Sequence, residues 1–125
     1  MRLQLVIEEG RFGVCRLGAA ERVPEWVPND GFCSVTRTRE ELSVVCDEVA
    51  IPSEVNCERG WRMLRVAGTQ AFTLAGVLSS VLEPLATAEI SIFAISTFNT
   101  DYVMVKAEDF ERAVEMLAKA GHSFS

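Results

Sequence analysis

The sequence has no long apolar run and few basic residues, and both shortages limit what the protein can do. No stretch approaches the roughly 20 apolar residues of a membrane-spanning helix. The amino terminus also lacks the charged, apolar and cleavage segments of a signal peptide. Lys and Arg number 12 against 18 Asp and Glu, giving a net charge of -6, and the basic residues are scattered. We therefore expect a cytoplasmic protein with neither nucleic acid nor membrane as a partner.

Motifs for catalysis and for metal binding are also missing. The chain contains no glycine-rich phosphate loop, nucleophile elbow or Cys-x-x-Cys pair. Its four cysteines, Cys15, Cys33, Cys46 and Cys57, have a single histidine, His122, to help them bind a metal. We interpret the cysteines as reduced thiols, several of them in strands, and His122 as a surface residue of the tail. We expect no enzyme activity, no metal and no cofactor.

Apolar residues, by contrast, are plentiful and patterned. Of 125 residues, 49% are hydrophobic, which is enough for one compact domain. Residues 88–94 and 102–105 are strand-like, and the turn residues Thr97 to Asp101 separate them. This pattern predicts a β-hairpin.

Helical patterns flank the predicted hairpin on both sides. Apolar residues between Leu74 and Leu85 recur at helical spacing, with Thr73 or Thr69 as a candidate N-cap. The segment from Phe110 to Ala120 shows a similar stripe, with acidic residues at its start and Gly121 as its stop. Both segments are predicted to be helices.

The amino-terminal part is richer in strands. Leu3 to Ile7 and Phe12 to Leu17 predict two short strands around a turn at Gly10, and residues 32–37 and 41–46 predict a second hairpin. A strand over residues 61–66 opens the second half of the chain. This order predicts an α+β, ferredoxin-like fold, with mainly antiparallel sheets covered by helices.

Five segments within this frame carry a family resemblance. They are Gly31-Phe-Cys-Ser-Val-Thr-Arg-Thr38, Glu41-Leu-Ser-Val-Val-Cys46, Glu58-Arg-Gly-Trp-Arg62, Gly76-Val-Leu-Ser-Ser80 and Ile90-Ser-Ile-Phe-Ala-Ile-Ser-Thr-Phe-Asn-Thr-Asp101. Together they resemble the small ACT-domain proteins of the type that also builds the animal cytosolic arginine sensors. The resemblance implies an ACT-type sandwich of two ACT-like lobes side by side, a degenerate lobe over residues 1–58 and an ACT lobe over residues 59–125.

The resemblance also implies a ligand site, because better-known members of the family bind small effectors, often amino acids, at a seam between ACT units. The family's ligand-facing turn, and the loop and helix start that face it, correspond in this sequence to Thr97, Phe98, Asp101, Phe72, Thr73 and Gly76. A helix amino terminus offers backbone N–H groups to a carboxylate. Asp101 suits an amine or guanidinium, Phe98 an apolar wall, and Gly76 a close approach to the backbone.

The main hypothesis is therefore a non-enzymatic regulatory or sensor module that binds an amino acid or similar small metabolite at the seam between ACT lobes. We also expect a homodimer. The alternative is a structural dimerisation or protein-interaction module without a ligand, in which Thr97 to Asp101 is an ordinary hairpin turn. A small enzyme that combines Asp101 with His122 or a cysteine is a third hypothesis, and it requires these groups to converge.

Overall fold

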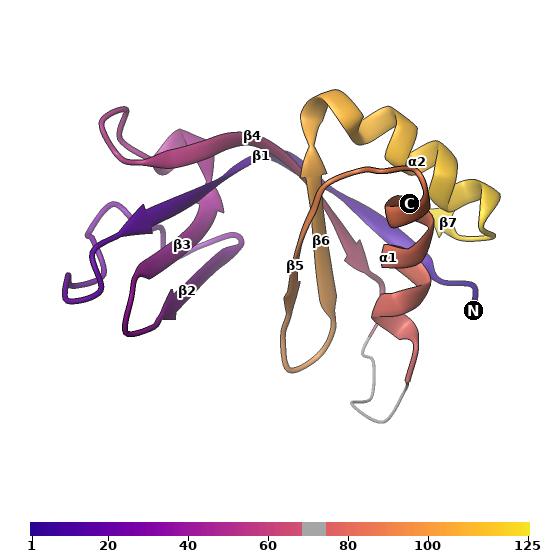
Figure 1. The fold of residues 1–125 in the computed structure, drawn as a ribbon, viewed down its shortest axis with the longest axis horizontal. Helices are drawn as coiled ribbons and strands as arrows, with labels where there is room; N and C mark the ends of the chain where they lie inside the picture. Colours follow the sequence, from indigo (N-terminus) through magenta and orange to yellow (C-terminus); the bar gives the residue numbers. More distant parts are fainter. Residues whose placement is uncertain (69–74) are drawn as a thin grey trace. The chain divides into compact units, whose positions relative to one another are not determined.

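The computed structural model describes residues 1–68 and 75–125, which form two compact units. Residues 1–9 and 62–125 form the first, here called the two-helix unit, and residues 10–61 form the second, here called the strand unit. Strands β1 (Gln4–Leu17) and β4 (Cys57–Val66) contribute to both units (Figure 1). Residues 1–9 thus group with the carboxyl-terminal part of the chain, which differs from the expected division at residue 58.

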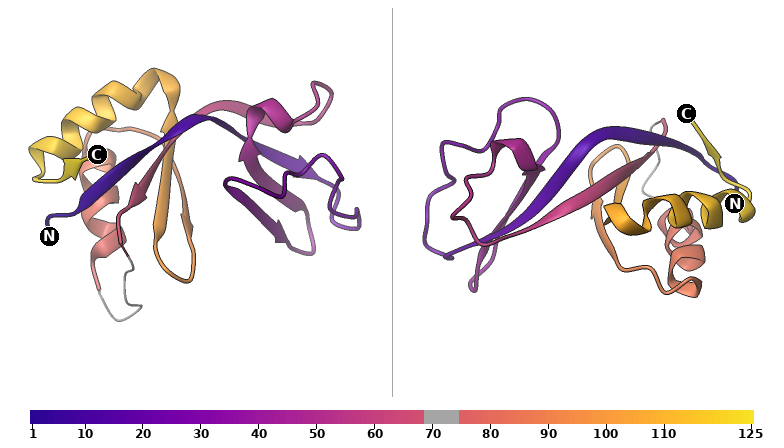
Figure 2. Two further views of the ribbon diagram at one scale, coloured as in Figure 1. Left: turned by 180° about the vertical axis from the view of Figure 1, so that it is seen from behind. Right: turned by 90° about the horizontal axis from the view of Figure 1, so that it is seen from above.

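The two-helix unit is a sheet covered on one face by two helices. Its strand order is β1-β4-β6-β5, where β5 is Ile92–Ser96 and β6 is Asp101–Lys106, and β7 (Ser123–Phe124) pairs with β1 in parallel. Helices α1 (Val77–Thr87) and α2 (Phe110–Lys119) pack side by side against this sheet (Figures 1 and 2). A short 3-10 turn, Ala107–Asp109, leads into α2. The predicted α+β class, the hairpin and both helices are confirmed.

Apolar side chains from both layers form the core of the two-helix unit. The buried residues are Leu5, Leu64, Val66, Ile90, Val103 and Val105 around the sheet, Val77, Val81 and Leu85 from α1, and Phe110, Ala113 and Leu117 from α2. The residues from each helix recur every three or four positions, as one face of an α-helix requires. Neither helix, at 11 and 10 residues, has the length to cross a bilayer, and no other described helix is longer.

The strand unit contains four strands and one turn of 3-10 helix, Glu48–Ala50. Its strand order is β2-β3-β1-β4, with β2 (Cys33–Arg37) and β3 (Leu42–Asp47) forming the predicted second hairpin. The predicted turn at Gly10 is wrong, because β1 runs through this residue as one strand of 14 residues. Gly10 has φ +90°, which glycine adopts readily without ending the strand.

Within the Glu58-Arg-Gly-Trp-Arg62 segment, the side chain of Arg59 holds β4 to the residues that follow β3. Its guanidinium donates hydrogen bonds to the carbonyls of Glu48 at 3.3 Å and Pro52 at 2.8 Å, while the Gly60 N–H donates to the Glu48 carboxylate at 2.9 Å. These bonds attach the segment after β3 to β4. Gly60 has φ +80°, a backbone angle that favours glycine.

A second apolar core lies on one face of the strand unit and depends on Gly13. This core includes Leu42, Val44 and Ile51. A Cβ atom at Gly13 would lie 2.5 Å from Cδ1 of Ile51 and 2.6 Å from Sγ of Cys57. The missing side chain therefore makes room for its neighbours.

Gly13→Ala is expected to lower the free energy of unfolding by about 1–3 kcal/mol, because overpacking a filled core forces neighbours to move. Urea unfolding measures this change. Gly18→Ala is the matched control, since its added Cβ would meet only the flexible Glu21 carboxylate, at 2.9 Å. Equal stability of the two variants would contradict the assignment of Gly13 to a filled core.

Candidate functional site

The β5–β6 turn is closed by a local network of hydrogen bonds. Ser96 pairs with Asp101 at the end of the hairpin, and the Ser96 hydroxyl donates a hydrogen bond to the Asp101 carboxylate. The Thr97 N–H donates to the Thr100 carbonyl at 2.8 Å, and the Thr97 hydroxyl donates to the same oxygen at 3.1 Å. These bonds orient Asp101 and fix the shape of the turn.

Thr100 attaches this turn to the neighbouring strand. Its side chain is buried, with a relative exposure of 9%, and its hydroxyl donates a 2.7 Å hydrogen bond to the Val66 carbonyl. Val66 is the last residue of β4, the strand that precedes α1 in the chain. The turn is therefore held at the carboxyl end of β4.

Helix α1 begins at the same end of the two-helix unit as the hairpin tip (Figures 1 and 2). Its N-cap, Gly76, has φ +86°, and the Gly76 carbonyl accepts the first helical bond, from Ser80 N–H at 2.9 Å. Among the described residues, no side chain caps this helix and its first turn carries no acidic residue. The first-turn N–H groups thus present a partial positive charge.

The predicted site residues differ in their surroundings. Thr97 and Gly76 are exposed, Phe98 has a relative exposure of 80%, and Asp101 is half-buried. The structure thus places Thr97, Phe98 and Asp101 on one turn, and Gly76 on the helix at the same end of the sheet. Phe72 and Thr73 lie outside the described residues.

Two residues that position the site were missing from the predicted set, Ser96 and Thr100. Thr100 was interpreted as an ordinary turn residue, and Ser96 lay between the predicted strand and the predicted turn. By the period-two alternation of β6, Thr100 shares a face with the buried Met104 and not with the core residues Val103 and Val105. No sequence pattern indicates that Val66 is its partner.

His122 is a buried residue, with a relative exposure of 5%, so its predicted surface position is wrong. The reason is the end of α2, where the His122 N–H donates to the Leu117 carbonyl at 3.1 Å and the Gly121 N–H donates to the Ala118 carbonyl at 3.0 Å. This pair of bonds is the Schellman motif, and Gly121 supplies its left-handed residue with φ +102°. The motif turns the chain back toward the helices.

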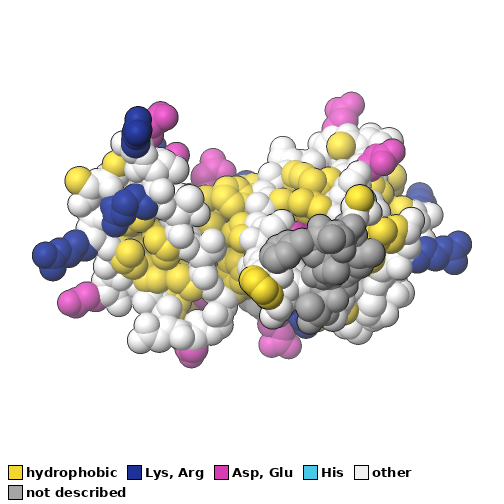
Figure 3. Space-filling model, turned by 90° about the horizontal axis from the view of Figure 1, so that it is seen from below, with side chains coloured by type: hydrophobic (Ala, Val, Ile, Leu, Met, Phe, Trp, Pro, Cys, Tyr) yellow, Lys and Arg dark blue, Asp and Glu magenta, His cyan; other side chains and the backbone are white. Residues whose placement is uncertain are grey.

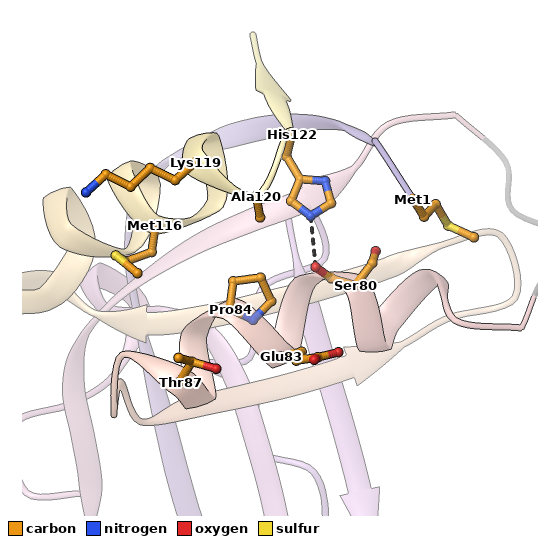
Figure 4. A pocket seen from close by; sticks show the side chains of 9 residues that line it. All are labelled: Met1, Ser80, Glu83, Pro84, Thr87, Met116, Lys119, Ala120 and His122. Carbon is orange, nitrogen blue, oxygen red and sulfur yellow. Dashed lines mark hydrogen bonds between the residues drawn. The ribbon is translucent and has the colours of Figure 1, made fainter.

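Both ring nitrogens of His122 have backbone partners, and Figure 4 shows the bond to Ser80. The Leu3 N–H donates to Nδ1 at 3.1 Å, so Nε2 carries the proton of the neutral ring and donates to the Ser80 carbonyl at 2.8 Å. His122 therefore connects β1, α1 and the end of α2. With both nitrogens used in this way, the ring is not available as a partner for Asp101, and the enzyme hypothesis loses its histidine.

A shallow groove of about 430 Å³ lies beside His122, between α1 and α2. Glu83 and Pro84 line one side, and Met116 and Lys119 line the other (Figure 4). Lys119 forms an exposed ion pair with Glu115 at 3.2 Å. We interpret the polar groups here as surface charge and the histidine as structural.

The surface charge follows the scattered sequence pattern. On the face shown in Figure 3, Lys, Arg, Asp and Glu side chains of the described residues are scattered, some of them next to a side chain of opposite charge, and no patch of a single sign forms. Within residues 1–68 and 75–125, no group of three or more His, Cys, Asp or Glu side chains has the arrangement of a metal site.

His122→Ala is expected to lower the free energy of unfolding by about 1–3 kcal/mol, because it leaves the Leu3 N–H and the Ser80 carbonyl without their buried partner. Chemical denaturation of the purified chain measures the loss. Lys119→Ala serves as the control, since an exposed ion pair contributes only about 0.5 kcal/mol. A His122→Ala chain as stable as the Lys119→Ala chain would show that the ring does not connect these elements.

Comparison with protein families identifies the class to which this fold belongs. A family model described as the ACT domain matches residues 56–119, and a second model, for an N-terminal domain, matches residues 10–54. Since the ACT model covers just over half of the chain, the protein belongs to the ACT domain family.

Similar proteins include both solved structures and curated sequences. Protein Atu0741 from Agrobacterium tumefaciens is 42% identical, with a TM-score of 0.95 over 100% of this chain and 93% of that chain. The cytosolic arginine sensor for mTORC1 subunit 1 of Homo sapiens is 31% identical over 70% of this chain, which spans only 30% of the sensor's length. The regulatory subunit of aspartate kinase from Thermus thermophilus shares the fold alone, with 9% identity and a TM-score of 0.61 over 93% of this chain and 96% of that subunit.

Proposed function

We propose that this ACT protein is a non-enzymatic regulatory module that binds an amino acid or a similar small metabolite. The site lies at one end of the two-helix unit, where the β5–β6 turn and the start of α1 are found. The observation that carries the proposal is the buried hydrogen bond from Thr100 to the Val66 carbonyl, which holds the turn at the end of the strand that precedes α1.

The start of α1 suits the carboxylate of an amino acid. Its first-turn N–H groups have no side-chain cap and no acidic neighbour among the described residues. An anion placed there is stabilised by these donors and by the helix dipole. Gly76 has no side chain, and apart from its chain neighbours none of the residues that the structure describes lies within 4 Å of the position of its missing Cβ.

The turn suits the rest of such a ligand. The Asp101 carboxylate is oriented by Ser96 and is available in this proposal to pair with an ammonium or guanidinium group. Phe98 places an aromatic ring at the surface, where apolar parts of a ligand pack. Thr97 holds the shape of the turn beside it, because its hydroxyl bonds the Thr100 backbone. Phe72 and Thr73 complete the proposed set on the family resemblance alone.

The relatives support a regulatory role in the cytoplasm. The curated proteins are named as cytosolic arginine sensors, and the chain covers about 30% of their length. An arginine-like or other amino acid ligand follows from that likeness by analogy. Binding would shift the population of a conformation that a downstream partner recognises.

A second copy of the chain is proposed to supply the other wall of the site. β5 lies at the end of the strand order, beside the turn that carries Phe98 and Asp101. Its sequence, Ile-Phe-Ala-Ile-Ser, contains no charge and no proline, the residues with which proteins commonly prevent strand pairing. A homodimer formed along this edge would bring two turns close together.

Asp101→Asn is expected to abolish the thermal response to the ligand, because it removes the charge that pairs with the ligand's cation. The amide oxygen still accepts the Ser96 hydrogen bond, so the fold is expected to stay within about 0.5 kcal/mol of wild type. A thermal-shift screen against the twenty amino acids measures both properties, since a ligand that binds the folded chain raises its melting temperature.

Glu115→Gln is the matched control, because it removes a carboxylate from the exposed face of α2. The proposal requires one class of amino acid to stabilise the wild type and the Glu115→Gln chain but not the Asp101→Asn chain. A response of equal size in all three would remove Asp101 from the site. A flat screen with a folded wild type would instead favour the ligand-free interaction module.

A further inference from the structure

All four cysteines of the chain lie in the strand unit and are free thiols. Cys33 of β2 pairs directly with Cys46 of β3, and Cys46 in turn pairs with Gly13 of β1. Directly paired residues face the same side of a sheet, and so does Cys15, two residues beyond Gly13. Sγ of Cys57 lies 2.6 Å from the position that a Cβ of Gly13 would occupy. The four thiols therefore share one face.

Cys15 and Cys57 are opposite each other on neighbouring strands. The Arg16 N–H donates to the Asn56 carbonyl at 3.0 Å, so residues 16 and 56 are paired and the next pair along is Cys15 with Cys57. In an antiparallel ladder the pair beside a hydrogen-bonded pair has its Cα atoms about 4.5 Å apart. Disulfides span Cα distances of about 4.4–6.8 Å, so this pair meets the requirement.

The two thiols also influence each other, because Cys57 is among the groups that raise the pKa of Cys15. Their exposure differs: Cys15 is buried, whereas Cys57 is partly accessible to solvent. A small reagent can therefore reach the Cys57 thiol, while the Cys15 thiol remains shielded from solvent.

We propose that Cys15 and Cys57 form an oxidisable dithiol that closes into a cross-strand disulfide with low-molecular-weight disulfides such as oxidised glutathione. The Cys57 thiolate attacks the reagent, forms a mixed disulfide and releases one thiolate. The Cys15 thiolate then attacks the Cys57 sulfur and releases the second. Overall, two protein thiols are oxidised, one reagent disulfide is reduced to two thiols, and the two protons of the protein thiols are transferred to the released thiolates.

The surroundings make this reaction slow at neutral pH. Burial, then the neighbouring thiols of Cys57 and Cys46, raise the pKa of Cys15 to about 12. Because only the thiolate attacks a disulfide, closure depends on the small deprotonated fraction of Cys15. The rate of closure is therefore expected to rise steadily between about pH 7 and pH 9, roughly tenfold for each pH unit while the thiol remains mostly protonated.

The experiment incubates the full chain with oxidised glutathione at pH 7, 8 and 9, blocks the remaining thiols by alkylation and maps disulfides by mass spectrometry. Trypsin releases residues 12–16 around Cys15, and cleavage after Glu48 and Glu54 separates Cys46 from Cys57. A cross-linked peptide that joins Cys15 to Cys57, formed faster at higher pH, is expected. Cys57→Ser should abolish this peptide, and Cys33→Ser should retain it.

Circular dichroism of each variant confirms that the comparison is made between folded chains. Three results would overturn the inference in a folded wild type: alkylation of both Cys15 and Cys57 after oxidation, a glutathione adduct on Cys57 that never resolves, and a cross-link that joins Cys57 mainly to Cys46. Since these thiols lie outside the proposed ligand site, none of these results bears on amino acid binding.

Discussion

The hydrogen bond from the Thr100 hydroxyl to the Val66 carbonyl is the constraint on which the proposed site depends. It is buried, so breaking it would leave a carbonyl without a partner, at a cost of about 1–3 kcal/mol. With the bond intact, the turn that carries Asp101 cannot move away from the end of β4. Helix α1 follows β4 in the chain, and the hairpin tip and the start of α1 share one end of the two-helix unit.

The same unit also fixes both ends of the chain. The Schellman motif after α2 turns His122 inward, where its ring accepts the Leu3 N–H and donates to Ser80 in α1. β7 then pairs in parallel with Gln4 and Leu5 of β1. These contacts hold the helices and both chain ends against the sheet. The strand unit is held by other features, the hydrogen bonds of Arg59 and the close packing beside Gly13.

Local patterns predicted most of the fold, whereas contacts between distant residues escaped prediction. The hairpin at Thr97 to Asp101 and the apolar stripes of both helices depend on neighbours in sequence, so they could be read from the chain. The burial of His122 depends on Leu3, 119 residues away, and no pattern reports such a pairing. Gly10 was misread because a positive φ angle is compatible with a turn and with a continuing strand. Asp101 and Gly76 were named from the family resemblance, while the role of Thr100 became clear only from its bond.

Amide chemical shifts of an isotope-labelled chain, recorded during titration with mixtures of amino acids, test the central claim most directly. If the ligand binds between the turn and the helix start, saturable shifts are expected to concentrate at residues 76–80 and 97–101. Shifts restricted to the strand unit, or a spectrum that no amino acid changes at millimolar concentration, would contradict the proposed site.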